Sequence, residues 1–306
     1  MRITQNMMTQ QFLYNLTQDA QRMQNAQVQM STGKVLNQPS DNPLAVSQVM
    51  AVNATLSQIT AYQSTISAGL TWMKNSSAAI QSIISQLQQV QGTVLQGLNT
   101  PANSASGNAA LSQTAKQLAE AVNQVLDSKQ GNRYLFGGTA TATAPSGYAG
   151  YGGAAASAPP GATQAIAYTI MSGVQVNVNA TAGAMFLTTS AGATSDLQGT
   201  LQSIVTDLAN GNHAALSQDL SNLNANLNQV VNINADLGTR IQRMTSAQNL
   251  MDQYSQRMTT QKGVIVDANM AQVITQFNTD QTVFQAALKM GASILLPSLV
   301  SYLPNG

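Results

Sequence analysis

The sequence predicts a mainly α-helical protein in which the N- and C-terminal halves form a long antiparallel, coiled-coil-like helical rod. A small β-rich outer domain is inserted between the two halves. Two long blocks indicate the rod, because their apolar residues recur at alternating steps of four and three positions, the spacing of a coiled-coil seam. The segment 139–193 contains no charged residue and is dominated by Gly, Ala, Ser and Thr, which predicts a separate insert.

The first block runs from Val52 to Leu98, and eleven of its fourteen seam positions are apolar. The three polar exceptions are spaced fourteen residues apart, at Gln63, Ser77 and Gln91. A polar residue in a seam lowers stability but sets the register of the paired helices. We therefore expect these three residues to set the register of the rod.

The second block repeats the spacing from Leu216 to Met258, with ten of thirteen seam positions apolar. A helix of almost fifty residues is about 70 Å long and cannot bury its apolar stripe against itself. The two blocks are therefore expected to pack against each other in an antiparallel bundle.

The uncharged middle segment contains a β-hairpin pattern. Apolar residues alternate with small or polar residues over 166–170 and again over 174–178, and a Met171-Ser172-Gly173 turn separates the two runs. Alternation with a period of two, interrupted by a glycine-containing turn, is typical of a hairpin.

Shorter apolar stripes mark the two ends of the chain. Helix breaks at 33–43 and near Gly263 separate them from the rod, with Asp267 as the expected N-cap of the last helix and Pro297 as its end. We expect these stripes to be buried only between subunits, so that the chain ends become ordered on assembly. The predicted interface residues are Leu13, Leu16, Met23, Met30, Met270, Ile274, Phe277, Phe284 and Leu288.

These patterns divide the chain into three parts. Residues 1–43 and 263–306 are expected to be terminal assembly helices, and residues 44–138 and 196–262 the helical rod. Residues 139–195 are expected to form the outer insert.

The composition excludes several kinds of site. With no cysteine and a single histidine, His213, the chain cannot form a thiolate zinc site, a disulfide or a polyhistidine metal site. A net charge of +1 with scattered basic residues argues against nucleic-acid binding, and no apolar run approaches the length of a membrane span. No paired carboxylates or nucleophile–base pattern occurs, so we predict no enzymatic activity, no cofactor and no metal.

Charged residues make up only 8% of the chain, against roughly a quarter in an ordinary protein. Asn and Gln supply about a fifth of the residues instead. Carboxylates become protonated near pH 4, whereas amides keep their hydrogen bonds. The sequence therefore predicts acidic surroundings and stability that is retained from about pH 7 to pH 3.

Short motifs in both halves resemble the flagellin superfamily. The N-terminal half carries Ser31-Thr32-Gly33-Lys34 and a proline-flanked turn at 39–43, in which Ser40 or Asp41 is expected to cap the next helix. The C-terminal motif Pro-Ser-Leu-x-x-Tyr-Leu is similar to the ending of the superfamily's hook–filament junction proteins, the third hook-associated proteins, whereas flagellins usually end differently. The motif residues are Gly33, Lys34, Pro39, Ser40, Asp41, Pro43, Pro297, Ser298, Leu299, Tyr302 and Leu303.

This resemblance implies a structural adaptor of the bacterial flagellum. Such a subunit would form a ring with copies of itself, between the first hook-associated protein and flagellin, and would bind a flagellar export chaperone before export. It would be secreted through the flagellar type III apparatus, which agrees with the absence of a signal-peptide pattern in the first thirty residues. The alternatives are a flagellin that forms long filaments and a coiled-coil binding protein of another class, such as a secreted effector or a chaperone.

Overall fold

The computed structural model describes residues 2–99, 105–147, 161–186 and 190–295. The chain divides into a terminal unit, residues 1–58 with 254–306, and a central unit, residues 59–253. The helices are α1 (Arg2–Thr32), α2 (Pro43–Asn99), α3 (Ala105–Leu126), α4 (Ala182–Phe186), α5 (Leu197–Asn210), α6 (His213–Val266) and α7 (Met270–Leu295). The strands are β1 (Lys129–Gln130), β2 (Arg133–Tyr134), β3 (Ala167–Met171) and β4 (Val174–Asn177).

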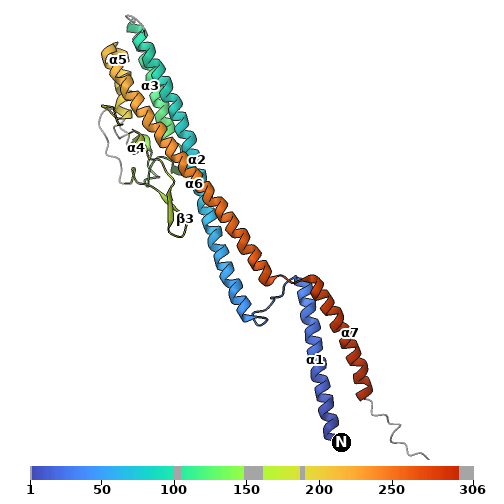
Figure 1. The fold of residues 1–306 in the computed structure, drawn as a ribbon. Coiled ribbons are helices and arrows are strands. Elements are labelled where there is room, and N and C mark those ends of the chain that lie inside the picture. Colours follow the sequence, from blue (N-terminus) through green and yellow to red (C-terminus); the bar gives the residue numbers. More distant parts are fainter. Residues whose placement is uncertain (1, 100–104, 148–160, 187–189, 296–306) are drawn as a thin grey trace, which may run out of the picture. The chain divides into compact units, whose positions relative to one another are not determined.

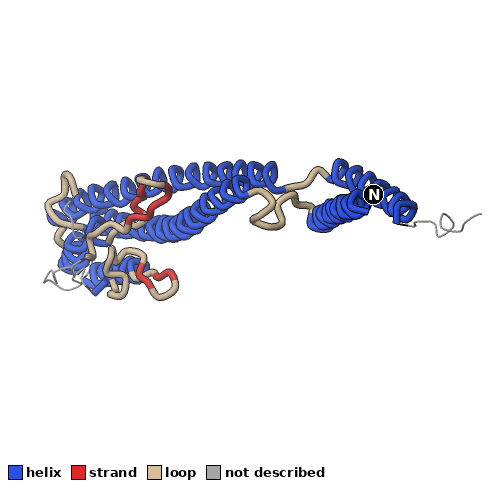
Figure 2. The backbone as a smooth tube through the Cα atoms, turned by 90° about the horizontal axis from the view of Figure 1, so that it is seen from below, coloured by secondary structure: helices blue, strands red, loops and turns tan. Residues whose placement is uncertain are grey.

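The two predicted seams face each other in the central unit, where α2 and α6 lie side by side (Figures 1 and 2). Their apolar seam residues are buried because neither helix can cover its own stripe. Gly69 of α2 permits a close approach, since a Cβ at this position would lie 2.2 Å from Cε of Met244. The buried seam residues are Ile59, Ile66, Leu70, Met73, Ile80, Leu87 and Val94 of α2 and Leu216, Leu223, Val230, Leu237, Met244 and Met251 of α6.

The three polar seam residues of α2 each hydrogen-bond to α6. Gln63 Nε2 donates to Asp252 Oδ1 at 2.6 Å. Ser77 Oγ donates to Asn234 Oδ1 at 2.9 Å, and Gln91 Nε2 donates to Asn224 Oδ1 at 2.8 Å. The partner numbers fall as the α2 numbers rise, so the pair is antiparallel as predicted, and the three bonds hold its register.

Helices α3 and α5 pack against each other in the same unit. Asp196 caps α5 by accepting from the Gly199 amide at 2.7 Å, and Gly211, with a φ of 63°, ends it. Helix α5 was not predicted from the sequence, because its fourteen residues are too few to show a long seam. The buried residues of this pair are Ala115, Ala119, Val122 and Leu126 of α3 and Leu197, Leu201, Ile204 and Leu208 of α5.

The insert contains the predicted hairpin. β3 and β4 pair in an antiparallel manner around Ser172 and Gly173, and the left-handed φ of 75° at Gly173 suits a two-residue turn. Amide and hydroxyl groups form hydrogen bonds between the insert and α6. Asn226 of α6 accepts from Ser190 Oγ at 2.5 Å, and Asn222 of α6 accepts from the Thr194 amide at 3.0 Å.

The terminal unit is built on α1 and α7, which pack along each other (Figure 1). Gly291 of α7 makes room for Phe12, since a Cβ at this glycine would lie 2.4 Å from Cζ of the ring. Ala26 of α1 and Val273 of α7 are buried. The apolar stripes at the two chain ends therefore cover part of each other within one chain.

Two predicted helix caps are wrong, each by one or two residues. Asn42, rather than Ser40 or Asp41, caps α2, because its Oδ1 accepts from the Ala45 amide at 3.1 Å; Pro43 occupies the first turn as predicted. Asn269, rather than Asp267, caps α7, since it receives the Val273 amide on its carbonyl at 2.9 Å and the Gln272 amide on its side chain at 3.4 Å.

Helix α6 also runs further than the predicted break near Gly263. It continues through that glycine to Val266, and the break lies at 267–269. Pro297 lies outside the described residues, so its predicted role at the end of α7 stays a prediction.

Candidate assembly surfaces

The nine predicted interface residues lie on α1 and α7 and are all at least partly exposed. Four are exposed, with exposed fractions of 50% for Leu13, 39% for Met270, 42% for Ile274 and 48% for Leu288. The other five, Leu16, Met23, Met30, Phe277 and Phe284, are half-buried. None of the nine is fully covered within the chain, so all of them retain apolar surface for a contact with another molecule.

Further exposed apolar side chains lie on the same helices and were missed in the sequence analysis. Their helical spacing places them beside the predicted stripe, and the sequence does not show which of two adjacent stripes faces the partner helix. They are Met7, Met8 and Tyr14 of α1 and Val283 and Met290 of α7.

The turn at 33–42 in the terminal unit is held by backbone bonds to the segment that joins α6 to α7. The Val35 amide donates to the Val266 carbonyl, and the Ala268 amide donates to the Gly33 carbonyl, each at 2.8 Å. Gly33 takes a left-handed φ of 69°, which explains why the motif needs a glycine here. Its neighbour Lys34 forms a single antiparallel bridge with Asp267.

Asp41 organises the other side of this turn. Its Oδ2 accepts from the Gln38 amide at 2.8 Å and from the Asn37 amide at 2.9 Å, and these backbone bonds, that of Gln38 foremost, lower the pKa of Asp41 below its usual value. A carboxylate whose pKa is lowered in the folded state stabilises the fold at pH values above its pKa in the unfolded state. This stabilisation is lost as the pH falls through the pKa of the folded state. Apolar side chains are exposed close by in the sequence, at Val35, Leu44 and Met50, and Val264 is exposed on α6 two positions before Val266.

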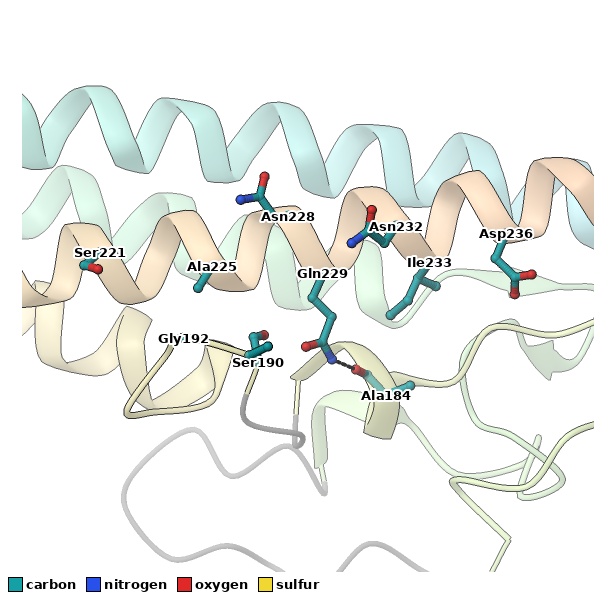
Figure 3. Close-up of a pocket in the computed structure, with 11 residues that line it drawn as sticks. Ala184, Ser190, Gly192, Ser221, Ala225, Asn228, Gln229, Asn232, Ile233 and Asp236 are labelled. Atoms are coloured by element: carbon teal, nitrogen blue, oxygen red, sulfur yellow. Dashed lines mark hydrogen bonds between the residues drawn. The ribbon is translucent and has the colours of Figure 1, made fainter.

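A cavity of 640 Å³ lies between α6 and the insert (Figure 3). Gln229 crosses it and donates to the Ala184 carbonyl at 2.6 Å, while Asp236, the charged residue of its lining, pairs with Arg240 at 2.5 Å. Its other polar groups are hydroxyls and amides such as Ser190 and Asn228. This set contains no nucleophile with an adjacent base, the arrangement that covalent catalysis requires.

The single histidine and the potential metal ligands are the other candidates for a chemical role. His213 is exposed in the first turn of α6. No group of three or more potential metal ligands occurs in the part of the chain that the structure describes. In that same part, no helix has the length and hydropathy required to span a membrane.

One pair of carboxyl groups was not expected from the sequence. Asp219 of α6 is buried, and burial followed by the charge of Asp207 on α5 raises its pKa to about 7. The two residues are twelve positions apart and belong to different helices, so only the packing of α5 on α6 reveals the pair.

The raised pKa of Asp219 makes the stability of the fold depend on pH. A raised carboxyl pKa contributes stability that is fully present below about pH 4 and is lost as the pH rises toward 7. We therefore expect Asp219→Asn to raise the melting temperature at pH 8 and to flatten its fall between pH 4 and pH 7. Thermal melting followed by circular dichroism across this range measures both effects, with Glu120→Gln, a change at an exposed carboxylate of α3, as the control. An unchanged pH dependence in Asp219→Asn would contradict the assignment.

Comparison with known families covers both halves of the chain. Residues 3–141 match the bacterial flagellin N-terminal helical region, and residues 220–303 match the bacterial flagellin C-terminal helical region. Together these matches span well over half of the chain. The chain belongs to the flagellin superfamily. As a member, it is a structural component of the bacterial flagellum, and the hairpin lies between the two matched regions.

Within the flagellin superfamily, the chain is similar to hook-associated proteins. It is 26% identical to flagellar hook-associated protein 3 of Salmonella typhimurium and 28% identical to that of Escherichia coli. Each comparison covers 94% of this chain and 95% of the relative. The fold is similar to that of the flagellar junction protein FlgL from Legionella pneumophila, with a TM-score of 0.57, 13% identity, and coverage of 72% of this chain and 99% of that one.

The superfamily motif is only partly visible in the structure. Gly33, Lys34, Pro39, Ser40, Asp41 and Pro43 lie in and beside the turn at 33–42, which joins the first two helices. Pro297, Ser298, Leu299, Tyr302 and Leu303 lie outside the described residues, so the predicted tail motif rests on sequence alone.

Proposed function

We propose that this chain is the hook-associated protein 3 of its flagellum, a structural subunit of the adaptor ring at the hook–filament junction. The observation that carries this proposal is the similarity to two proteins of that name over 94% of the chain, which includes both terminal helices and the insert. A flagellin is not favoured, since both relatives are hook-associated proteins.

The terminal helices provide the physical basis for assembly. The exposed stripe residues of α1 and α7 lose contact with water when a neighbouring subunit covers them, and each fully buried side chain of this kind contributes about 1.5–3 kcal/mol. Several such contacts offset the entropy lost when the two helices are held in place. We infer that the chain forms a ring with its own copies and contacts the first hook-associated protein on one side and flagellin on the other.

Export and the absence of enzymatic activity belong to the same proposal. The chain binds an export chaperone before export, travels unfolded through the flagellar type III apparatus, and acts outside the cell as a structural part. A role without catalysis is supported by the similarity to hook-associated proteins, which are structural parts of the flagellum.

Deletion of the gene tests the proposal directly. Without the adaptor, hooks should form, filaments should not attach, and flagellin should accumulate in the culture medium. Electron microscopy of the cells and immunoblots of the medium measure these outcomes.

In a second experiment, purified chain is added to flagellin seeds. Long filaments of this chain alone would establish a flagellin instead, and normal filaments on the deletion strain would exclude the adaptor role.

A further inference from the structure

Two buried carboxylates lie in the pair formed by α1 and α7. Asp19 of α1 forms an ion pair with Arg22 one turn further on. Asp280 of α7 is only 6% exposed; its Oδ1 accepts from Gln276 Nε2 at 2.9 Å, whereas its buried Oδ2 has no hydrogen-bond partner in the described part of the chain. A carboxylate that is buried without a cationic partner lowers the stability of the surrounding fold.

Asp280 lines a cavity of 430 Å³ in the terminal unit. This volume is far larger than the roughly 30 Å³ that one water molecule occupies in the liquid. The lining combines apolar side chains such as Val35 and Val273 with polar groups. The polar groups include the amide side chains of Asn25, Gln29 and Gln272 and the guanidinium of Arg22. Arg22 is paired with Asp19, and no ion pair joins it to Asp280 among the described residues. The cavity therefore has room for a cationic side chain beside a carboxylate that lacks one.

The terminal unit of another copy can provide such a cation. Residues 1–58 and 254–306 contain six basic residues and four carboxylates, so basic groups are in excess. Within the described residues, Lys34, Lys262 and Lys289 take part in no ion pair. A neighbouring copy thus presents positive charges that its own carboxylates do not neutralise.

We propose that, in the assembled ring, a lysine or arginine from the terminal unit of a neighbouring copy enters this cavity and pairs with Asp280. The proposal rests on the ring assembly inferred above. In the free chain, burial of the unpaired Asp280 carboxylate lowers the stability of the α1–α7 pair. In the ring, the neighbour's cation compensates for this loss. Asp280 therefore favours the assembled state over the free subunit.

The isosteric variant Asp280→Asn separates this role from a structural one, because the two roles predict opposite results. In the free chain, the neutral amide removes the buried charge, so hydrogen exchange of the α1 and α7 amides should be as slow as in the wild type or slower. In cells that co-express tagged variant and wild-type chains, the variant should be depleted about tenfold in detached flagella relative to its share in the cell, since a charged interface pair contributes strongly to association.

Matched variants identify the partner. Asp267→Asn removes an exposed carboxylate of the same unit and should be incorporated like the wild type. Each basic residue of the unit other than Arg22 is replaced by glutamine. One replacement should reproduce the depletion of Asp280→Asn, and combining it with Asp280→Asn should add no further loss. The five variants are Arg2→Gln, Lys34→Gln, Arg257→Gln, Lys262→Gln and Lys289→Gln.

Three results would overturn the inference: incorporation of Asp280→Asn at the wild-type ratio, faster exchange in the free Asp280→Asn chain, or no basic variant that shares its loss. The last result would assign the cation to a different protein or to a bound ion. Absence of the wild-type chain from detached flagella is a separate outcome, because it refutes the adaptor function itself.

Discussion

Leu288→Asp should exclude the chain from the flagellum while leaving both units folded. Leu288 is 48% exposed on α7, so an aspartate at this position can keep its charge in water in the free chain. In an assembled ring, the same change removes a buried leucine, a loss of about 1.5–3 kcal/mol, and places an unpaired carboxylate at a desolvated interface, which costs further free energy. We expect at least a hundredfold loss of incorporation, measured by immunoblotting of detached flagella against the cellular pool.

Gln285→Asp is the matched control for this change. Gln285 is an exposed polar residue on the same helix, one turn before Leu288, and the substitution introduces the same charge. This variant should be incorporated like the wild type, and both variants should show the wild-type helical signal in circular dichroism. Normal incorporation of Leu288→Asp would exclude Leu288 from the interface, and equal loss in both variants would assign the effect to charge alone.

Gly138→Ala should destabilise the central unit where the rod meets the insert. Gly138 has a left-handed φ of 59°, which costs an L-residue about 1–2 kcal/mol. A Cβ at this position would also lie 2.2 Å from the Gly161 carbonyl oxygen and 2.6 Å from that of Ala162. Because these atoms belong to the backbone, the chain must shift, and the total loss should be about 2–5 kcal/mol.

Gly131→Ala isolates the effect of the close contact. Gly131 has almost the same φ, 60°, but no atom lies within 4 Å of its would-be Cβ, so this variant should lose only about 1–2 kcal/mol. The single tryptophan, Trp72, is buried beneath Arg133 of β2 and reports unfolding of this region by fluorescence. Equal melting temperatures for the two variants would contradict the steric explanation.

The long-range pairing of the rod was accessible from sequence because it depends on periodicity. A seam repeated over some forty residues, with polar exceptions at Gln63, Ser77 and Gln91, predicts two paired helices and a defined register. The hairpin around Ser172 and Gly173 was predictable for the same reason, since alternation and a turn glycine are local signals. The helix caps were less certain, because several adjacent residues, such as Asp41 and Asn42, have suitable side chains.

Local sequence patterns thus specified the helices, the seams and the hairpin, and the composition specified the low charge. Which side of α1 faces α7, the approach of Asp207 to Asp219 and the isolation of the Asp280 carboxylate became visible only in the folded molecule. These features depend on the relative rotation and approach of helices that are distant in sequence, and such geometry is set by the summed packing of many side chains rather than by any one segment. Apolar periodicity shows that a helix has a surface to bury, and only the packed structure shows how much of that surface remains for a neighbouring subunit.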